Sequence, residues 1–294
     1  MPTSSSTLPG VVVRMLEDLE VPDRTKVFQA GGGTDYSTAL MCERLGDRYV
    51  TSREYDPALC DVGRARLAAL GYRPRLVCGD AARGYPDAAP YGRIISTYSP
   101  THVPAAGLEQ AAPGALVLVS LVGSLRAYGY VRLSKRSDTE ASGRFINGDV
   151  SFMPSREMGS PEIGPLIRSA LADRRRSRGA DPVIHPDVVD EQGLMWAAQV
   201  ALPGTTRLSL TTENGSGRWF IHPDGSWAVL ETRTDADVRA FQGGPRPLWS
   251  ELEKIITRWL SDERPGLERY GLTVTPNANT VWLDEPGRTV GTLT

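Results

Sequence analysis

Two spacings of apolar residues alternate along the first 125 residues of the chain. Short runs such as KVFQA at 26–30 and ALVLVSLVG at 115–123 are typical of buried strands, whereas the runs between them repeat apolar positions at helical spacing. We therefore predict strands at 26–30, 49–55, 75–80, 93–99 and 115–123, and helices at 11–19, 36–45, 57–70 and 108–112. This alternation predicts an α/β fold, in which helices cover both faces of a mostly parallel sheet.

The second half of the chain has a different pattern. Residues 124–186 are rich in Arg, Ser, Gly and Pro, and 174–182 are predicted to form an exposed loop. Alternating segments with turn residues between them then predict antiparallel strands, followed by an amphipathic helix at 247–262 and a final hairpin. We expect three parts: a nucleoside-binding domain at 1–125, a connecting region at 126–190 and an α+β C-terminal extension at 191–294.

Composition and charge exclude several classes of protein. The 294 residues are 40% hydrophobic and 23% charged, with a net charge of −2, so the chain has no overall attraction for nucleic acid or an anionic membrane. No run approaches the ~18 apolar residues of a membrane span, and MPTSSSTLPG does not have the pattern of a secretory signal. Three widely spaced cysteines and three scattered histidines predict a cytoplasmic protein with no metal site.

Three motifs at the ends of successive predicted strands point to a bound nucleoside. Gly31, Gly32 and Gly33 join a strand to a helix, where backbone N–H groups can approach a ligand closely. Glu54 ends the next strand, about twenty residues later, and can accept hydrogen bonds from ribose hydroxyls. Asp80 ends the third strand, within reach of an adenine amino group. Ligands of such sheets bind at this edge, so the three motifs together predict a nucleoside cofactor.

The glycine motif favours S-adenosylmethionine over NAD, because Tyr36 replaces the last glycine of GxGxxG. The segments VFQAGGGTDYSTALMCERLGD, VTSREYDPAL and LVCGDAARGYPDAAPYGRIISTYSPTHVP resemble the protein-L-isoaspartate O-methyltransferase family. They are most similar to its branch associated with ATP-grasp enzymes in the maturation of ribosomally made peptides, as is the tail from FQGGPRPLWSELEKIITRWL to WLDEP.

This resemblance implies a Rossmann-like, class I methyltransferase fold and the methylation of an aspartyl or isoaspartyl carboxylate in a peptide or protein. In the peptide-maturation branch, the ester is expected to collapse to an aspartimide. The resemblance also assigns a group of residues to the cofactor, namely Gly31, Gly33, Thr34, Tyr36, Glu54, Asp80 and Ala81. It assigns Thr7, with Ser6 before it, to the family's active-site hydroxyl; a role at a helix N-terminus is the alternative for Thr7.

The chain departs from the family pattern at four points. Gln29 replaces an acid, Asp35 a glycine and Gly92 an aspartate, and the segment before SSSTLP is short. The charge of Asp35 could oppose the cofactor's carboxylate or pair with its amino group. A different hypothesis follows, in which a weakened homologue binds a precursor peptide or partner enzyme as a scaffold. Peptide recognition would then use the C-terminal half, where tryptophans and the basic run 174–178 could take part. The alternative is that the tryptophans form core and that the basic run is a solvated loop.

Overall fold

The computed structural model describes residues 7–146, 148, 150–156, 159, 162–182, 184–213, 215–233 and 237–293. Contacts divide the chain into two units, the first made of 1–122, 129–158 and 268–294, and the second of 123–128 and 159–267. These boundaries differ from those expected at 125 and 190. The reason is that strands after residue 128 and after residue 269 hydrogen-bond into the sheet of the first unit.

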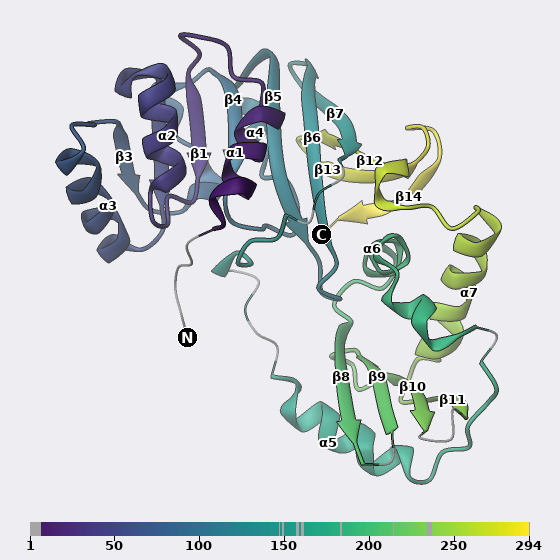
Figure 1. The fold of residues 1–294 in the computed structure, drawn as a ribbon. Coiled ribbons are helices and arrows are strands. Elements are labelled where there is room, and N and C mark those ends of the chain that lie inside the picture. The colour runs from purple at the N-terminus through teal and green to yellow at the C-terminus, as the bar shows by residue number, and fades with distance from the viewer. Residues whose placement is uncertain are drawn as a thin grey trace. The chain divides into compact units, whose positions relative to one another are not determined.

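The first unit is built on one ten-stranded sheet with the order β14-β13-β12-β7-β6-β5-β4-β1-β2-β3 (Figure 1). Its strands are β1 (Val27–Ala30), β2 (Val50–Glu54), β3 (Arg75–Cys78), β4 (Tyr91–Ser96), β5 (Ala111–Val122), β6 (Tyr128–Ser137), β7 (Glu140–Phe145), β12 (Tyr270–Thr275), β13 (Ala278–Leu283) and β14 (Thr289–Leu293). Strands β1 to β5 pair in parallel, and β6, β7, β12, β13 and β14 continue the sheet by antiparallel pairing. The predicted Rossmann-like α/β fold with additional C-terminal strands is confirmed.

Helices cover the parallel half of this sheet. They are α1 (Pro9–Asp18), α2 (Tyr36–Leu45), α3 (Pro57–Ala69) and α4 (Ala105–Glu109). On one face, Met15 of α1 and Met41 of α2 pack in a core with Val27 and Ile95. The first three helices begin and end near the predicted residues, since Pro57 suits a first helical turn and Gly46 adopts φ 89° directly after α2. The helix predicted at 108–112 is instead found at Ala105–Glu109, because Ala111 already begins β5.

The region expected to connect two domains contains β6, β7 and helix α5 (Ile163–Arg174). In β6, buried Val131 and Leu133 alternate with half-buried Arg132 and Ser134. Its arginines and serines suggested irregular structure, but they are the polar positions of a strand with one buried face. Part of the predicted loop at 174–182 also belongs to α5, which ends at Arg174.

The second unit has a four-stranded antiparallel sheet with the order β11-β10-β9-β8. Its elements are β8 (Thr206–Thr212), β9 (Gly215–Ile221), β10 (Trp227–Arg233), β11 (Val238–Gly243), α5, α6 (Gln192–Ala201) and α7 (Leu248–Ser261). The aromatic side chains considered for peptide recognition are all 4% exposed or less, and they are Trp196, Trp219, Phe220, Trp227 and Trp249. They therefore form core, not a peptide-binding surface.

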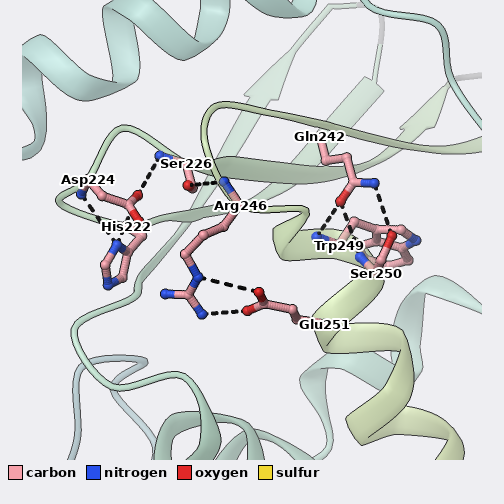
Figure 2. Close-up of polar contacts among 8 residues, drawn as sticks. All are labelled: His222, Asp224, Ser226, Gln242, Arg246, Trp249, Ser250 and Glu251. Atoms are coloured by element: carbon pink, nitrogen blue, oxygen red, sulfur yellow. Dashed lines mark hydrogen bonds and ion pairs between the residues drawn. The ribbon is translucent and has the colours of Figure 1, made fainter.

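Polar side chains join the β9–β10 turn and the start of α7 (Figure 2). The Asp224 carboxylate accepts from the Ser226 N–H at 2.8 Å, and the Ser226 hydroxyl accepts from the Arg246 N–H at 2.9 Å. Gln242 Oε1 accepts from the N–H groups of Trp249 and Ser250, which are otherwise unsatisfied at a helix N-terminus. Because Ser226 is fully buried and already bonded, we assign this group to stability.

Candidate functional site

The glycine-rich turn follows β1 at the carboxyl edge of the sheet. Gly31 and Gly33 have φ values of 92° and 57°, which favour glycine. A Cβ atom at Gly31 would lie 3.4 Å from Thr97 and Tyr98, so the turn is closely packed against the end of β4. The turn leads directly into α2, as the sequence predicts.

Gln29 holds this turn from behind. Its side chain is fully buried, and Nε2 donates to the Gly31 carbonyl at 3.0 Å and to the Ser37 hydroxyl at 2.8 Å. Its Oε1 lies 3.0 Å from the Thr38 hydroxyl. The amide that replaces the family's acid is thus bonded within the protein and positions the turn.

Asp35 is the residue before α2, in a left-handed conformation with φ 61°. Its side chain is 4% exposed and is not among the residues that line the cavity described below. One carboxyl oxygen lies 2.9 Å from the Thr38 hydroxyl, and the other is directed at Gly63 of α3. Both charge interactions considered from the sequence required the carboxylate to face the cofactor, whereas it lies behind the loop.

Burial raises the pKa of Asp35, while the Thr38 hydrogen bond lowers it and the Glu54 charge raises it further. The Thr38 hydroxyl contacts both Asp35 and Gln29 but has one hydrogen to donate. The Thr38 hydroxyl is therefore shared between the Asp35 carboxyl and the Gln29 amide oxygen.

Glu54 ends β2 beside the glycine turn. Its Oε2 accepts from the Gly33 N–H at 2.8 Å, and its Oε1 accepts from the Asp56 N–H at 3.0 Å. Each carboxylate oxygen can accept a further bond, so the pair remains able to receive two hydroxyl groups. This pair of acceptor oxygens fits the two hydroxyl groups of a ribose.

Asp80 follows β3 and begins the short 3-10 helix of Ala81–Arg83. Its Oδ1 accepts from the Ala82 N–H at 2.9 Å, and Oδ2 lies 3.6 Å from Nε of Arg83. The carboxylate is therefore held in place at the third strand end, where an adenine amino group can donate to it.

One cavity in the first unit brings the predicted residues together. Its lining includes every residue assigned to the cofactor, namely Gly31, Gly33, Thr34, Tyr36, Glu54, Asp80 and Ala81, and also Thr7. Ser6 lies outside the described residues. Thr7 directly precedes Leu8, the N-cap of α1, so it lies at the N-terminal turn of this helix as the alternative expects, although among the described residues no side chain caps this end.

Sequence reasoning missed further residues of the cavity wall, among them two stretches of the chain. Thr97 and Tyr98 follow β4, so the strand-end rule that indicated Glu54 and Asp80 could have found them. Residues 152–156 also line the cavity, although no local pattern indicated it. They are held by Ser99, whose N–H donates to the Met153 carbonyl at 2.9 Å and whose carbonyl accepts from the Ser155 N–H at 2.9 Å.

Gly92, the third departure from the family pattern, lies away from the cavity lining. A Cβ atom there would lie 2.6 Å from Thr25, and the Gly92 N–H donates to the Lys26 carbonyl at 3.0 Å. The strand β4 begins at Tyr91, before the predicted start, so Gly92 does not prevent strand formation here.

Two absences apply to the part of the chain that the structure describes. Its His, Cys, Asp and Glu side chains form no group of three or more suited to a metal ion. In the same residues, no helix combines the length and apolar character needed to cross a membrane.

Comparisons with known proteins show which family the chain resembles. The family model for protein-L-isoaspartate(D-aspartate) O-methyltransferase matches residues 3–158. A protein-L-isoaspartate O-methyltransferase of Ignicoccus hospitalis is 38% identical over 113 residues, which cover 38% of this chain and 54% of the relative. One of Thermotoga maritima is 28% identical over 277 residues, covering 94% of this chain and 80% of the relative.

A solved structure of a protein-L-isoaspartate O-methyltransferase has a TM-score of 0.55 and 22% identity to this chain. The match covers 96% of this chain and 83% of that one. The likeness concerns the fold. The match to the Ignicoccus hospitalis relative spans about half of that relative's length, 54%.

Proposed function

Because the chain belongs to the protein-L-isoaspartate(D-aspartate) O-methyltransferase family, we propose that it methylates a carboxylate of an aspartyl or isoaspartyl residue in a peptide or protein. The cofactor is S-adenosylmethionine. The observation that supports the proposal best is the cavity at the carboxyl ends of β1, β2 and β3. Residues from all three strand ends and Thr7 line it together.

The residues present fit this cofactor. The Glu54 carboxylate keeps acceptor sites free for the ribose hydroxyls, and Asp80 can accept from the adenine amino group. Gly31 and Gly33 let the backbone approach without side chains in the way. When bound, S-adenosylmethionine supplies an electrophilic methyl group on a sulfonium centre.

Methyl transfer requires the protein to orient the acceptor carboxylate toward the methyl group and little else. The acceptor carboxylate, with an ordinary pKa near ~4, is ionised at neutral pH, so no general base is required. Alignment alone can lower the barrier by ~7 kcal/mol or more. We assign Thr7 to this alignment, because its hydroxyl can donate a hydrogen bond to the acceptor carboxylate. Ser6, next to it, is proposed for the same role.

Methyl transfer is tested with labelled S-adenosylmethionine and two peptides that differ only in carrying Asp or isoAsp at one position. We expect a base-labile methyl ester on at least one of them. Thr7→Ala should lower kcat by about tenfold or more, the usual worth of one positioned donor, and leave S-adenosylhomocysteine binding unchanged. Binding of S-adenosylhomocysteine without transfer to either peptide would contradict the enzyme and favour the scaffold hypothesis.

A finer proposal concerns the fate of the ester. The segment from Phe241 to Pro286 resembles the tail of the branch that acts with ATP-grasp ligases on ribosomal precursor peptides. We propose that such a precursor is the substrate and that its ester closes to an aspartimide. Mass spectrometry separates the two products, since the ester has gained one methylene and the aspartimide has lost one water.

Three free cysteines suit the proposed cytoplasmic location.

A further inference from the structure

The charges around the cofactor cavity are uneven. Among the described residues that line it, Glu54 and Asp80 are acidic, and Arg156 has the one positively charged side chain. Both acids are suited to the nucleoside part of the cofactor. A carboxylate substrate that enters this cavity is therefore attracted by Arg156 and repelled by the other two ionised groups.

Arg156 is held at a defined place in the wall. The segment before it is fixed by the two main-chain hydrogen bonds between Ser99 and residues 153 and 155. The guanidinium lies 5.0 Å from the centre of the Tyr55 ring, and Nη2 donates to Asp56 Oδ2 at 3.1 Å. Asp56 also accepts from the Ala58 N–H at 3.0 Å as the N-cap of α3. The cation is thus oriented by groups that the fold itself positions.

This arrangement leaves the guanidinium able to bind a ligand. An arginine has five N–H donors. Within the part of the chain that the structure describes, the hydrogen bond from Arg156 to Asp56 uses Nη2. Its side chain is 45% exposed. Nη2 carries a second hydrogen, so together with Nε or Nη1 it can still present a fork that matches a carboxylate.

The exposed apolar groups of the same cavity fit a peptide chain. Tyr36, Tyr55 and Met153 line the same cavity and are 39%, 51% and 37% exposed. Exposed aromatic and methionine side chains next to one cation suit a peptide with an acidic residue among apolar ones. A free small carboxylic acid would leave these groups uncovered.

We propose that Arg156 binds a second carboxylate of the peptide substrate, next to the one that receives the methyl group. This inference rests on the proposed function and narrows its substrate class to peptides with an acidic residue close to the acceptor. The acceptor carboxylate itself is not assigned to Arg156, because a tight ion pair would withdraw charge from the attacking oxygen. Arg156 is then a specificity-determining residue.

The experiment measures binding to the S-adenosylhomocysteine-loaded protein, so it does not depend on turnover. Two fluorescent isoAsp peptides differ only in having Glu or Gln beside the isoAsp residue, and their dissociation constants are compared by anisotropy. The wild type should bind the Glu peptide about threefold to fivefold more tightly, the size of one largely exposed ion pair. In Arg156→Gln the two affinities should become equal, and Arg156→Lys should restore part of the difference.

Arg64→Gln is the matched control, because Arg64 on α3 also pairs with an aspartate, Asp61, at 2.9 Å but is not a residue of the cavity wall. It should keep the wild-type ratio. An unchanged ratio in Arg156→Gln, or a wild type that does not distinguish or bind the peptides, would overturn the proposal. So would a loss of S-adenosylhomocysteine affinity beyond about tenfold in Arg156→Gln, which would make Arg156 a cofactor ligand. If the wild type distinguishes the two peptides but transfers no methyl group, this result would contradict the proposed enzyme activity and not the role of Arg156.

Discussion

The carboxyl group of Asp35 packs against the backbone of Gly63, in the space where any other residue would have its Cβ atom. A methyl group at Gly63 would lie 1.8 Å from Asp35 Oδ2. The position of the Asp35 carboxyl before α2 therefore requires a glycine at 63 within α3. This contact accounts for the direction of Asp35, which departs from the family pattern without placing a charge in the cofactor cavity.

Gly63→Ala should lower the free energy of unfolding by ~1–3 kcal/mol, because the new methyl group displaces the buried carboxyl. In an Asp35→Gly background the sign should reverse. The clash is then absent, and alanine within a helix is favoured over glycine by up to ~1 kcal/mol. Urea unfolding of the four variants measures both effects. Equal effects of Gly63→Ala in the two backgrounds would contradict the contact.

Asp35 should also make stability depend on pH. Its pKa is raised above the ordinary 3.8, first by burial, so the folded chain binds this proton more tightly than the unfolded chain does. The free energy of unfolding therefore falls as pH rises from about 4 through the folded-state pKa. Asp35→Asn should remove this fall and be the more stable protein at neutral pH.

Thermal unfolding of the wild type and Asp35→Asn from about pH 4 to pH 8 tests this linkage. Asp61→Asn serves as a control, because the Asp61 side chain is 79% exposed. A constant difference in Tm between wild type and Asp35→Asn over the whole range would show that Asp35 titrates normally.

Glu54→Gln should weaken S-adenosylhomocysteine binding by about tenfold to a hundredfold. The carboxylate accepts from the Gly33 and Asp56 N–H groups and keeps acceptor sites for ribose, whereas an amide has one oxygen. Hydrogen bonds to charged groups contribute ~1.5–3 kcal/mol. Calorimetric titration gives the affinity, and circular dichroism checks that the variant is folded. Affinity within twofold of wild type would contradict the assignment of Glu54.

The three cysteines should differ in reactivity. Burial raises the pKa of Cys42 and of Cys60 to about 12, so their thiolate forms are scarce at neutral pH. Cys78 is exposed. Brief alkylation of the folded protein with iodoacetamide, followed by peptide mapping, should label Cys78 first, and all three after unfolding. Equal labelling of Cys60 and Cys78 in the folded protein would refute this.

Much of the lining of the candidate site could be predicted because its signals are local. The glycines at 31–33 follow β1, Glu54 ends β2, and Asp80 lies shortly after β3 in the same parallel sheet. Parallel strands bring their carboxyl ends to one edge, so residues far apart in the sequence meet there by rule. Thr7 also lines the cavity, a position that only the family resemblance predicted.

The sequence by itself therefore determined the order of elements from α1 to β5 and the nucleoside side of the cavity, since periodicity and turn chemistry act between near neighbours in the chain. Tertiary structure alone decided that β12 to β14 extend the main sheet, that residues 152–156 complete the cavity wall, and that Asp35 faces Gly63. Each of these depends on contacts between segments distant in sequence. The place of β12 to β14 depends on which sheet edge can accept a further strand, and the place of residues 152–156 depends on which main-chain groups can bond to them. No local pattern encodes that choice, because hydrogen bonding and packing are settled only when the whole sheet has formed.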